Sequence, residues 1–229
     1  MNWAGDLIDL YEKNSDKAGI IEKRNDMPYV LLPPFHTTVT AQIEVTIDEN
    51  GTFLRAETVD NIKKFTIIPI TEKSGSRTAG KEPHPLCDNL KYLAGDYKNY
   101  CEDDGVCHDL YIKKLEKWCQ SDYSHKKVHA IYLYLVKGTL IKDLLEYRVL
   151  KLNEKGILDE KETIQGIPQT KAFVRFIIRS VNPPDECWKD QSLQQCYIEY
   201  SRSLEKNKGI CYLSGNMESI TYLHSKKIR

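Results

Sequence analysis

The chain has 229 residues, which is long enough to bury a core as one large domain or two small ones. Its 33 Lys and Arg residues balance 33 Asp and Glu residues, so no overall basic excess attracts the chain to nucleic acid or to membranes. The charges are unevenly distributed, because residues 1–60 contain five basic and eleven acidic side chains. An anion-binding site is therefore expected after residue 60.

The sequence carries no sign of secretion or of a membrane span. Seven cysteines are an odd number, and the first residues lack the basic start and the continuous apolar run of a signal peptide. No apolar run approaches the length that crosses a bilayer. These features predict a cytoplasmic protein with free thiols and no contact with a membrane.

A short amphipathic helix is expected over residues 3–13. Trp3, Leu7, Leu10 and Tyr11 recur at helical spacing, and the acidic residues between them would face water. This spacing is typical of a helix that packs one apolar face.

A β-hairpin is expected next, in "AQIEVTIDENGTFLRAETV". Alternating apolar residues predict one buried face, and they are Ala41, Ile43, Val45 and Ile47, then Leu54 and Ala56 after an Asn50-Gly51 turn. The following strand, "FTIIPIT", contains Pro69, which has no backbone N–H and predicts the edge of a sheet.

A helical block is expected at about residues 100–150. Its apolar positions share helix faces in three groups: Tyr111, Leu115 and Trp118; Val128, Ile131, Tyr132 and Leu135; and Leu140, Ile141, Leu144 and Leu145. Gly138 should end one helix and Thr139 should cap the next.

The remaining pattern gives a strand, a helix and a short strand. "KAFVRFIIRSV" alternates, with Arg175 and Arg179 on a partly basic face, then residues 193–204 carry a helical apolar stripe, and "GICYL" closes the order. The predicted fold class is α+β, a small and mainly antiparallel sheet with a helical block inserted between its strands.

The segment "TEKSGSRTAGKEPHPLCDNLKYLAGDY" is the main candidate site. Lys73, Arg77 and Lys81 recur every fourth position, yet the glycines and prolines among them favour a loop over a helix. A loop that combines cations, hydroxyls and glycines can bind phosphate through side chains and backbone N–H groups. The alternative is a solvated connector with no ligand.

Cys101, Cys107, His108 and Cys119 suggest a zinc site, because Cys and His are the usual zinc ligands. The spacing lacks a C-x2-C knuckle, and the Cys119 position falls on an apolar helix face. Idle or buried thiols are the better interpretation.

The sequence gives little support for a catalytic site. His84 with Cys87 has no third group to orient the base, and Asp103 with Asp104 adjoins a glycine in an acidic loop. We therefore expect a protein that is not an enzyme, with no catalytic residue, no metal site and no cofactor.

Long stretches of the chain resemble one known family. "LPPFHTTVTAQIEVTIDENGTFLRAETV", "TIIPITEKSGSRTAGKEPHPLCDNLKYLAGDY", "FVRFII" and "CYLSG" are similar, in order, to the N-terminal part of the large subunit of type I-C CRISPR Cascade. Members of that family are longer and continue into a helical C-terminal part. The resemblance therefore implies that residues 1–229 form an N-terminal domain of a longer large subunit.

The resemblance also implies a function. Such a subunit has no nuclease activity of its own, recognises the protospacer-adjacent motif (PAM) on target double-stranded DNA and helps to open it, while guide RNA reads the remaining sequence. The implied partners are target DNA, guide RNA through the complex, other Cascade subunits and a recruited helicase-nuclease.

Within this reading, the candidate segment binds DNA. The expected DNA-binding residues are Lys73, Ser74, Ser76, Arg77, Thr78, Lys81 and His84. Lysines suit phosphates, and the arginine fork suits a phosphate or a base edge. The alternative is a protein-docking module that holds the large subunit to the subunit at the guide end, without direct reading of the motif.

Overall fold

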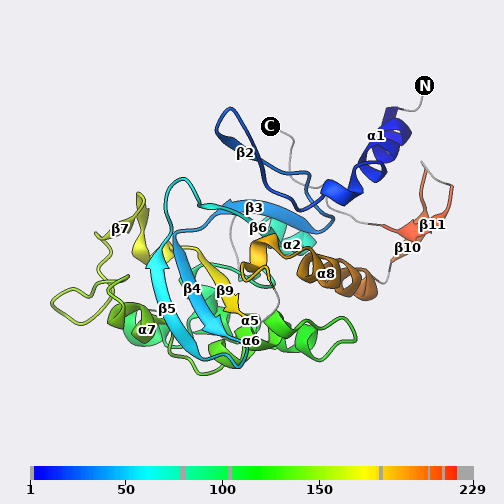
Figure 1. Cartoon of the computed structure of the whole chain (residues 1–229). Helices are drawn as coiled ribbons and strands as arrows, with labels where there is room; N and C mark the ends of the chain where they lie inside the picture. Colours follow the sequence, from blue (N-terminus) through cyan, green and yellow to red (C-terminus); the bar gives the residue numbers. More distant parts are fainter. Residues whose placement is uncertain are drawn as a thin grey trace.

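The fold is built around a mixed three-stranded sheet (Figure 1). The computed structural model describes residues 3–77, 81–102, 105–180, 183–205, 207–212 and 215–220. Strand β4 (Ile43–Asp48) lies between β5 (Phe53–Thr58), to which it is antiparallel, and β9 (Val174–Arg179), to which it is parallel. The predicted hairpin is confirmed, and the predicted α+β class is confirmed with it.

Strand β4 is buried on both faces, although the alternation predicted one buried face. Ile43, Val45 and Ile47 are fully buried as expected, while Glu44 and Thr46 on the opposite face are buried too. Because β4 is the central strand and Glu44 is paired with a buried arginine, polar residues on its second face also lie inside.

The second strand of the hairpin differs from its prediction because it contains a β-bulge. The register of β4 and β5 shifts between Thr46 and Ile47, so that Ile47 lies opposite Phe53. Leu54 is the extra residue, with no partner on β4, and it is 42% exposed, while Ala56 is buried as predicted.

The helical block lies against one side of the sheet, as Figure 1 shows. It contains α5 (Val106–Cys119), α6 (Lys126–Leu135) and α7 (Leu140–Glu146), between β6 and β9 in the chain. Their predicted apolar faces are buried against the strands and against one another. This burial forms the main hydrophobic core.

The junction of α6 and α7 differs from its prediction in one detail. Gly138 follows α6 with a φ of 65°, as a helix terminator should. The start of α7 is capped by Asp96, whose carboxylate accepts from the backbone N–H groups of Ile141 (3.1 Å) and Lys142 (3.0 Å). Thr139 occupies the N-cap position as predicted, but its hydroxyl donates to Asp143 (2.9 Å) and accepts from no backbone N–H of the helix.

A second layer of short elements completes the body. Strands β3 (His36–Thr40) and β6 (Phe65–Pro69) form an antiparallel pair, which agrees with an edge strand at Pro69. Helix α8 (Gln191–Leu204) and the 3-10 turn η3 (Cys187–Lys189) follow β9. The remaining body elements are α2 (Glu72–Gly75), α3 (Leu90–Leu93), α4 (Tyr97–Tyr100), β7 (Thr163–Ile164), β8 (Ile167–Pro168) and η2 (Gln169–Lys171).

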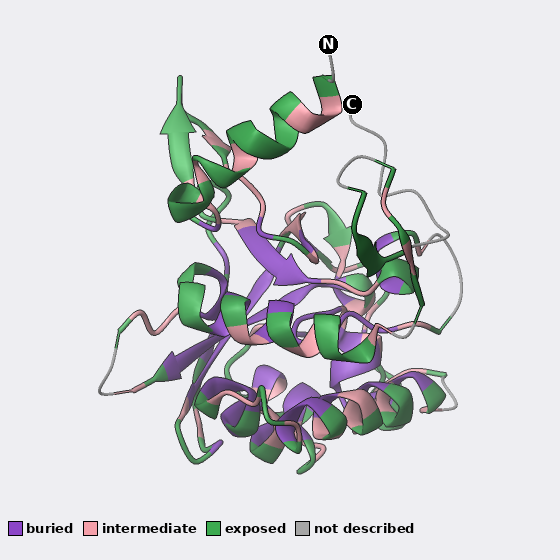
Figure 2. Ribbon diagram, turned by 90° about the vertical axis from the view of Figure 1, so that its right-hand side faces the viewer, coloured by how far each residue is buried: buried purple, intermediate pink, exposed green. Residues whose placement is uncertain are grey.

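The chain ends are less deeply packed than the body. The N-terminal elements are α1 (Trp3–Glu12), η1 (Ser15–Lys17), β1 (Glu22–Arg24) and β2 (Met27–Tyr29), and the C-terminal ones are β10 (Lys208–Ile210) and β11 (Met217–Ser219). Figure 2 shows that α1 stands above the body with most of its surface exposed. The predicted helix exists, but no residue of it is buried.

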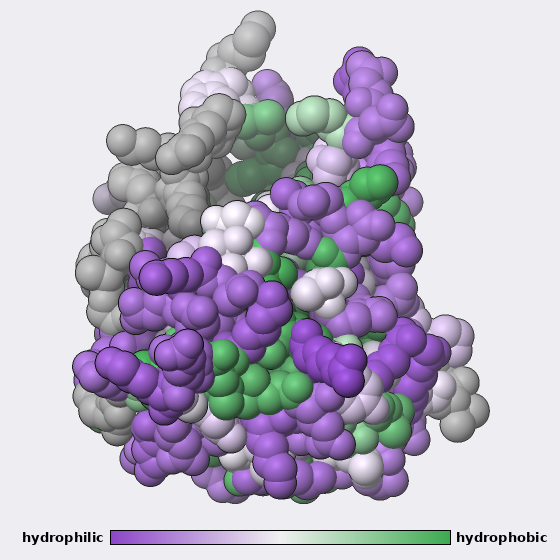
Figure 3. Space-filling model, turned by 90° about the vertical axis from the view of Figure 1, so that its left-hand side faces the viewer, coloured by the Kyte–Doolittle hydropathy of each residue, from purple (hydrophilic) through white to green (hydrophobic). Residues whose placement is uncertain are grey.

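The surface is mostly polar. A view of the face that carries the β7 side of the molecule shows hydrophilic side chains with smaller apolar areas among them (Figure 3). Within the described ranges, no helix has the length and the apolar content to cross a membrane.

Candidate nucleic-acid interface

The candidate segment, residues 71–88, begins with one helical turn where the glycines and prolines had predicted a loop. The Thr71 hydroxyl accepts from the Ser74 backbone N–H (3.0 Å), and the Ser74 hydroxyl accepts from the Thr71 N–H (2.9 Å). This reciprocal capping satisfies donors that a four-residue helix would otherwise leave open. The Thr-x-x-Ser spacing was the signal in the sequence that could have predicted α2.

Arg77 forms the contacts that hold the segment together. Its guanidinium forms a two-pronged ion pair with Asp88, with Nη1–Oδ2 at 2.9 Å and Nη2–Oδ1 at 2.8 Å. Nη1 also donates to the Glu82 carbonyl (2.7 Å), and the guanidinium carbon lies 4.4 Å from the centre of the Tyr92 ring. Arg77 therefore joins the two ends of residues 77–82 to each other and to the core.

Asp88 holds this arrangement in the interior. Its side chain is fully buried and accepts four hydrogen bonds, two from Arg77 and one each from the N–H groups of His84 (2.7 Å) and Asn89 (2.8 Å). Its own carbonyl accepts from the N–H of Val174 on β9 (3.0 Å). The segment is thereby anchored directly to the central sheet.

The charge of Arg77 is maintained by this pair. Burial disfavours the guanidinium charge, but the hydrogen bonds and the charge of Asp88 outweigh that effect and raise the pKa of Arg77 above its ordinary value. Arg77 and Asp88 thus form a neutral, geometrically fixed unit.

Two more predicted DNA-binding residues point inward. Ser74 is 2% exposed and His84 is 8% exposed. The His84 Nδ1 atom lies 3.0 Å from the Ser74 hydroxyl, so each side chain supports the other beneath the surface. In this arrangement they hold the segment and do not face a ligand.

The exposed members of the predicted set are Lys73, Ser76 and Lys81. The Ser76 hydroxyl donates to the carbonyls of Glu72 (3.0 Å) and Lys73 (3.3 Å), which leaves its lone pairs for an external donor. Thr78 lies outside the described residues. The structure therefore brings two lysines to the surface on either side of residues 78–80, over a clamped base.

The predicted basic face of β9 is not a surface. Arg175 is 3% exposed, donates twice to Glu44 Oε2 (2.9 and 2.7 Å) and stacks 3.7 Å from the Trp188 ring centre. Arg179 is exposed and pairs with Asp185 (3.0 Å). The β9 arginines are thus committed to internal or local ion pairs.

The groups weighed for metal or nucleophilic chemistry are dispersed or buried. None of the seven cysteines forms a disulfide, and the described part of the chain contains no cluster of three or more His, Cys, Asp or Glu side chains that could hold a metal. Asp103 and Asp104 lie outside the described residues. Burial raises the pKa of the Cys119 thiol to about 11 and that of Cys87 well above its usual range, which disfavours thiolate formation.

Comparison with known protein families identifies a match over most of the chain. Residues 7–229 fit the model of a protein family described as CRISPR-associated protein (Cas_Csd1). No curated protein matches the chain.

Proposed function

Because the chain belongs to the Cas_Csd1 family of CRISPR-associated proteins, we propose that it is part of the DNA-binding large subunit of an RNA-guided surveillance complex of type I-C. In this role it recognises the PAM on target duplex DNA and helps to open the duplex, and guide RNA pairs with the exposed strand. It cuts no nucleic acid itself and leaves cleavage to a recruited helicase-nuclease.

The observation that carries the proposal is the clamped segment at residues 71–88. Two exposed lysines, Lys73 and Lys81, belong to a segment that is held to the body by the ion pair between Arg77 and the fully buried Asp88. A fixed base holds the cations in one geometry, so less side-chain and backbone freedom is lost when phosphates bind. A flexible, solvated connector would not need a buried ion pair.

The contacts of Arg77 change the roles that we propose for the residues of the segment. Arg77 would have to break two hydrogen bonds to Asp88 before it could reach a base edge. We therefore assign Arg77, Ser74 and His84 to positioning, and Lys73, Ser76 and Lys81 to contact with DNA.

The test is the affinity of the assembled complex for duplex DNA. Lys73→Gln/Lys81→Gln should weaken binding to duplexes with and without the motif, whereas a matched pair on α5, Lys113→Gln/Lys117→Gln, should leave both affinities unchanged. Equal behaviour of the two double variants would contradict the proposal. Incubating the purified chain with DNA and Mg²⁺ tests the absence of cleavage, and cutting that a chelator abolishes would contradict it.

A second candidate function is protein docking, and one observation favours it. Trp3, Leu7 and Leu10 lie on one face of α1 and are 71%, 53% and 58% exposed. The helix contains three acidic residues and no basic one. Such a face fits a basic and apolar surface of a neighbouring subunit, so both functions can reside in one chain.

Docking has its own test. Leu7→Gln/Leu10→Gln should reduce incorporation of the chain into the complex when it is co-expressed with the other subunits, without weakening duplex binding by the isolated chain. Unchanged incorporation would exclude α1 as a docking element.

A further inference from the structure

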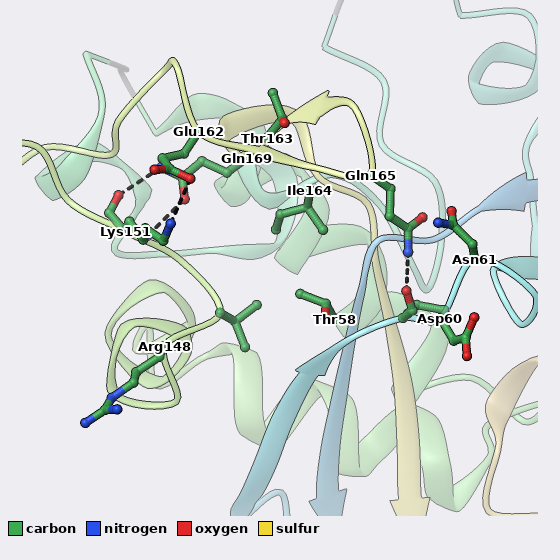
Figure 4. A pocket seen from close by; sticks show the side chains of 12 residues that line it. Thr58, Asp60, Asn61, Arg148, Lys151, Glu162, Thr163, Ile164, Gln165 and Gln169 are labelled. Atoms are coloured by element: carbon green, nitrogen blue, oxygen red, sulfur yellow. Dashed lines mark hydrogen bonds and ion pairs between the residues drawn. The ribbon is translucent and has the colours of Figure 1, made fainter.

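A pocket of about 460 Å³ is lined by no residue of the basic segment, and Figure 4 shows the side chains that do line it. Its walls come from the end of β5, the segment after α7 and the β7–β8 hairpin. Val59, Val149 and Ile164 supply apolar surface, and threonine, asparagine and glutamine side chains supply polar atoms. A volume of this size accommodates a small organic group such as a nucleotide.

One wall is held by a fully bonded glutamine. Gln169 is 1% exposed, its Oε1 accepts from the Lys151 N–H (3.0 Å), and its Nε2 donates to the carbonyls of Lys151 (2.8 Å) and Asp159 (2.7 Å). The wall therefore keeps its shape without an occupant, which lowers the cost of binding.

The opposite wall contains an unsatisfied acceptor. Gln165 stands at the tip of the β7–β8 hairpin with a φ of 54°, a conformation that a side-chain-bearing residue adopts at a cost. Its Nε2 donates to the Val59 carbonyl, but its buried Oε1 has no hydrogen-bond partner. Figure 4 shows this amide beside the exposed side chain of Asn61. If Asn61 turns aside, a donor on an occupant can reach the oxygen.

Four charged side chains line the rim of the pocket. Two of them form an ion pair, and the other two, Asp60 and Arg148, lie on opposite sides. Lys151 pairs with Glu162 (3.0 Å), and Asp60 accepts from the Ile62 N–H (3.0 Å). Arg148 is exposed, and it forms no ion pair within the described part of the chain. Figure 4 shows its side chain directed away from the pocket. A neutral group thus fits inside, and an anionic group at the rim can pair with Arg148 once that side chain turns toward the pocket.

We propose that this pocket binds one unpaired nucleobase, with the attached phosphate at Arg148. The aliphatic surface packs on the face of the base, the amides and hydroxyls meet its edge, and an N–H donor of the base can satisfy Gln165. A base within a duplex cannot enter a concave site, so the occupant is unstacked. The inference rests on the proposed function, because opening of target DNA creates unpaired strands.

The occupant can come from a single-stranded nucleic acid or from a free nucleotide, and two probes distinguish these sources. The 229-residue chain is titrated with six-nucleotide DNA and RNA homopolymers and with the four nucleoside monophosphates, while amide chemical shifts are recorded. We expect the shifts to move at Asn61, Thr163 and Gln165. Tighter binding of the oligonucleotides by about tenfold or more would identify a strand, since neighbouring nucleotides add contacts. Equal affinity would identify a free nucleotide.

Variants decide whether the pocket is the site. Thr58→Phe fills the pocket from an exposed strand end and should weaken binding by about tenfold or more. Thr40→Phe, at the exposed end of β3, is its matched control and should bind as the natural chain does. Arg148→Gln should weaken binding by about threefold to tenfold and reduce its salt dependence.

The proposal would be overturned if neither probe moved these amides, or if Thr58→Phe and Thr40→Phe bound alike. Its failure is separable from that of the proposed function. Thr58→Phe leaves Lys73 and Lys81 in place, so binding to intact duplex should remain unchanged whichever result the pocket gives.

Discussion

The segment at residues 71–88 and the helix α1 contrast in how they use their side chains. The segment is rich in polar residues, yet Ser74, His84 and Asp88 are buried in a closed hydrogen-bond network. The helix is amphipathic, yet Trp3, Leu7 and Leu10 are exposed. Polarity alone therefore does not decide burial here. A polar group is buried where its partners satisfy it, and an apolar face is covered only where another element reaches it.

The largest expected effect is a loss of stability when the hydrogen-bond network of residues 71–88 is broken. Asp88→Ala should lower the free energy of unfolding by about 3–5 kcal/mol, because it leaves the charge of Arg77, whose side chain is only 14% exposed, without its partner. Urea denaturation measures this loss. A loss below about 1 kcal/mol would show that water reaches Arg77 and that the segment is not anchored.

A pH effect on the body should be nearly as large. Burial lowers the pKa of His36 to about 4, from an ordinary value near 6.5, and its ring packs against Tyr197, whose hydroxyl donates to the Ile70 carbonyl (3.0 Å) just before the segment. The unfolded chain therefore binds a proton at a higher pH than the folded chain. Stability present above pH 6.5 is lost as the pH falls toward 4, by up to about 3 kcal/mol.

The variant His36→Asn isolates this contribution. Its amide can keep the donor to the Pro34 carbonyl, which lies 2.8 Å from His36 Nδ1, but it does not titrate. Unfolding free energies measured between pH 7 and pH 4 should fall less steeply in the variant. An identical slope in both chains would show that His36 is accessible to protons in the folded state.

A smaller loss is expected at the cap of α2. Ser74→Ala removes the acceptor for the Thr71 N–H and the partner of the His84 ring, and should cost about 1–2 kcal/mol. Thermal denaturation measures it, and Ser76→Ala provides an exposed control within the same turn. Equal midpoints for the two variants would mean that the capping box contributes nothing.

The smallest change in stability is expected for substitutions on the exposed apolar face of α1. Leu7→Gln/Leu10→Gln should change the free energy of unfolding by no more than about 0.5 kcal/mol per site, because both residues are more than half exposed. Urea denaturation of the purified chain checks it. A loss above about 2 kcal/mol would show that α1 packs against the body in solution.

The sequence predicted the individual helices and strands better than it predicted which of them pair with each other. Period-two alternation placed Ile43, Val45 and Ile47 in the core, and helical spacing did the same for Tyr111 and Leu115, because both patterns report burial of a local face. The parallel pairing of β4 with β9 joins residues 131 positions apart, such as Glu44 and Arg175, and no local pattern encodes it.

The candidate site was predicted in position but not in architecture. The density of cations and hydroxyls marked residues 73–84, and that region does present Lys73 and Lys81 at the surface. The pairing of Arg77 with Asp88 could not be predicted, since an arginine at a loop position has the same local signature whether it faces solvent or a buried carboxylate.

The salt dependence of duplex binding tests the central claim most directly. The logarithm of the binding constant falls linearly with the logarithm of salt concentration, with a slope of about −0.9 for each phosphate contact. If the clamped segment presents Lys73 and Lys81 to DNA, Lys73→Gln/Lys81→Gln should make that slope shallower by about two units, while Lys113→Gln/Lys117→Gln leaves it unchanged. An unchanged slope in the first variant would contradict the account.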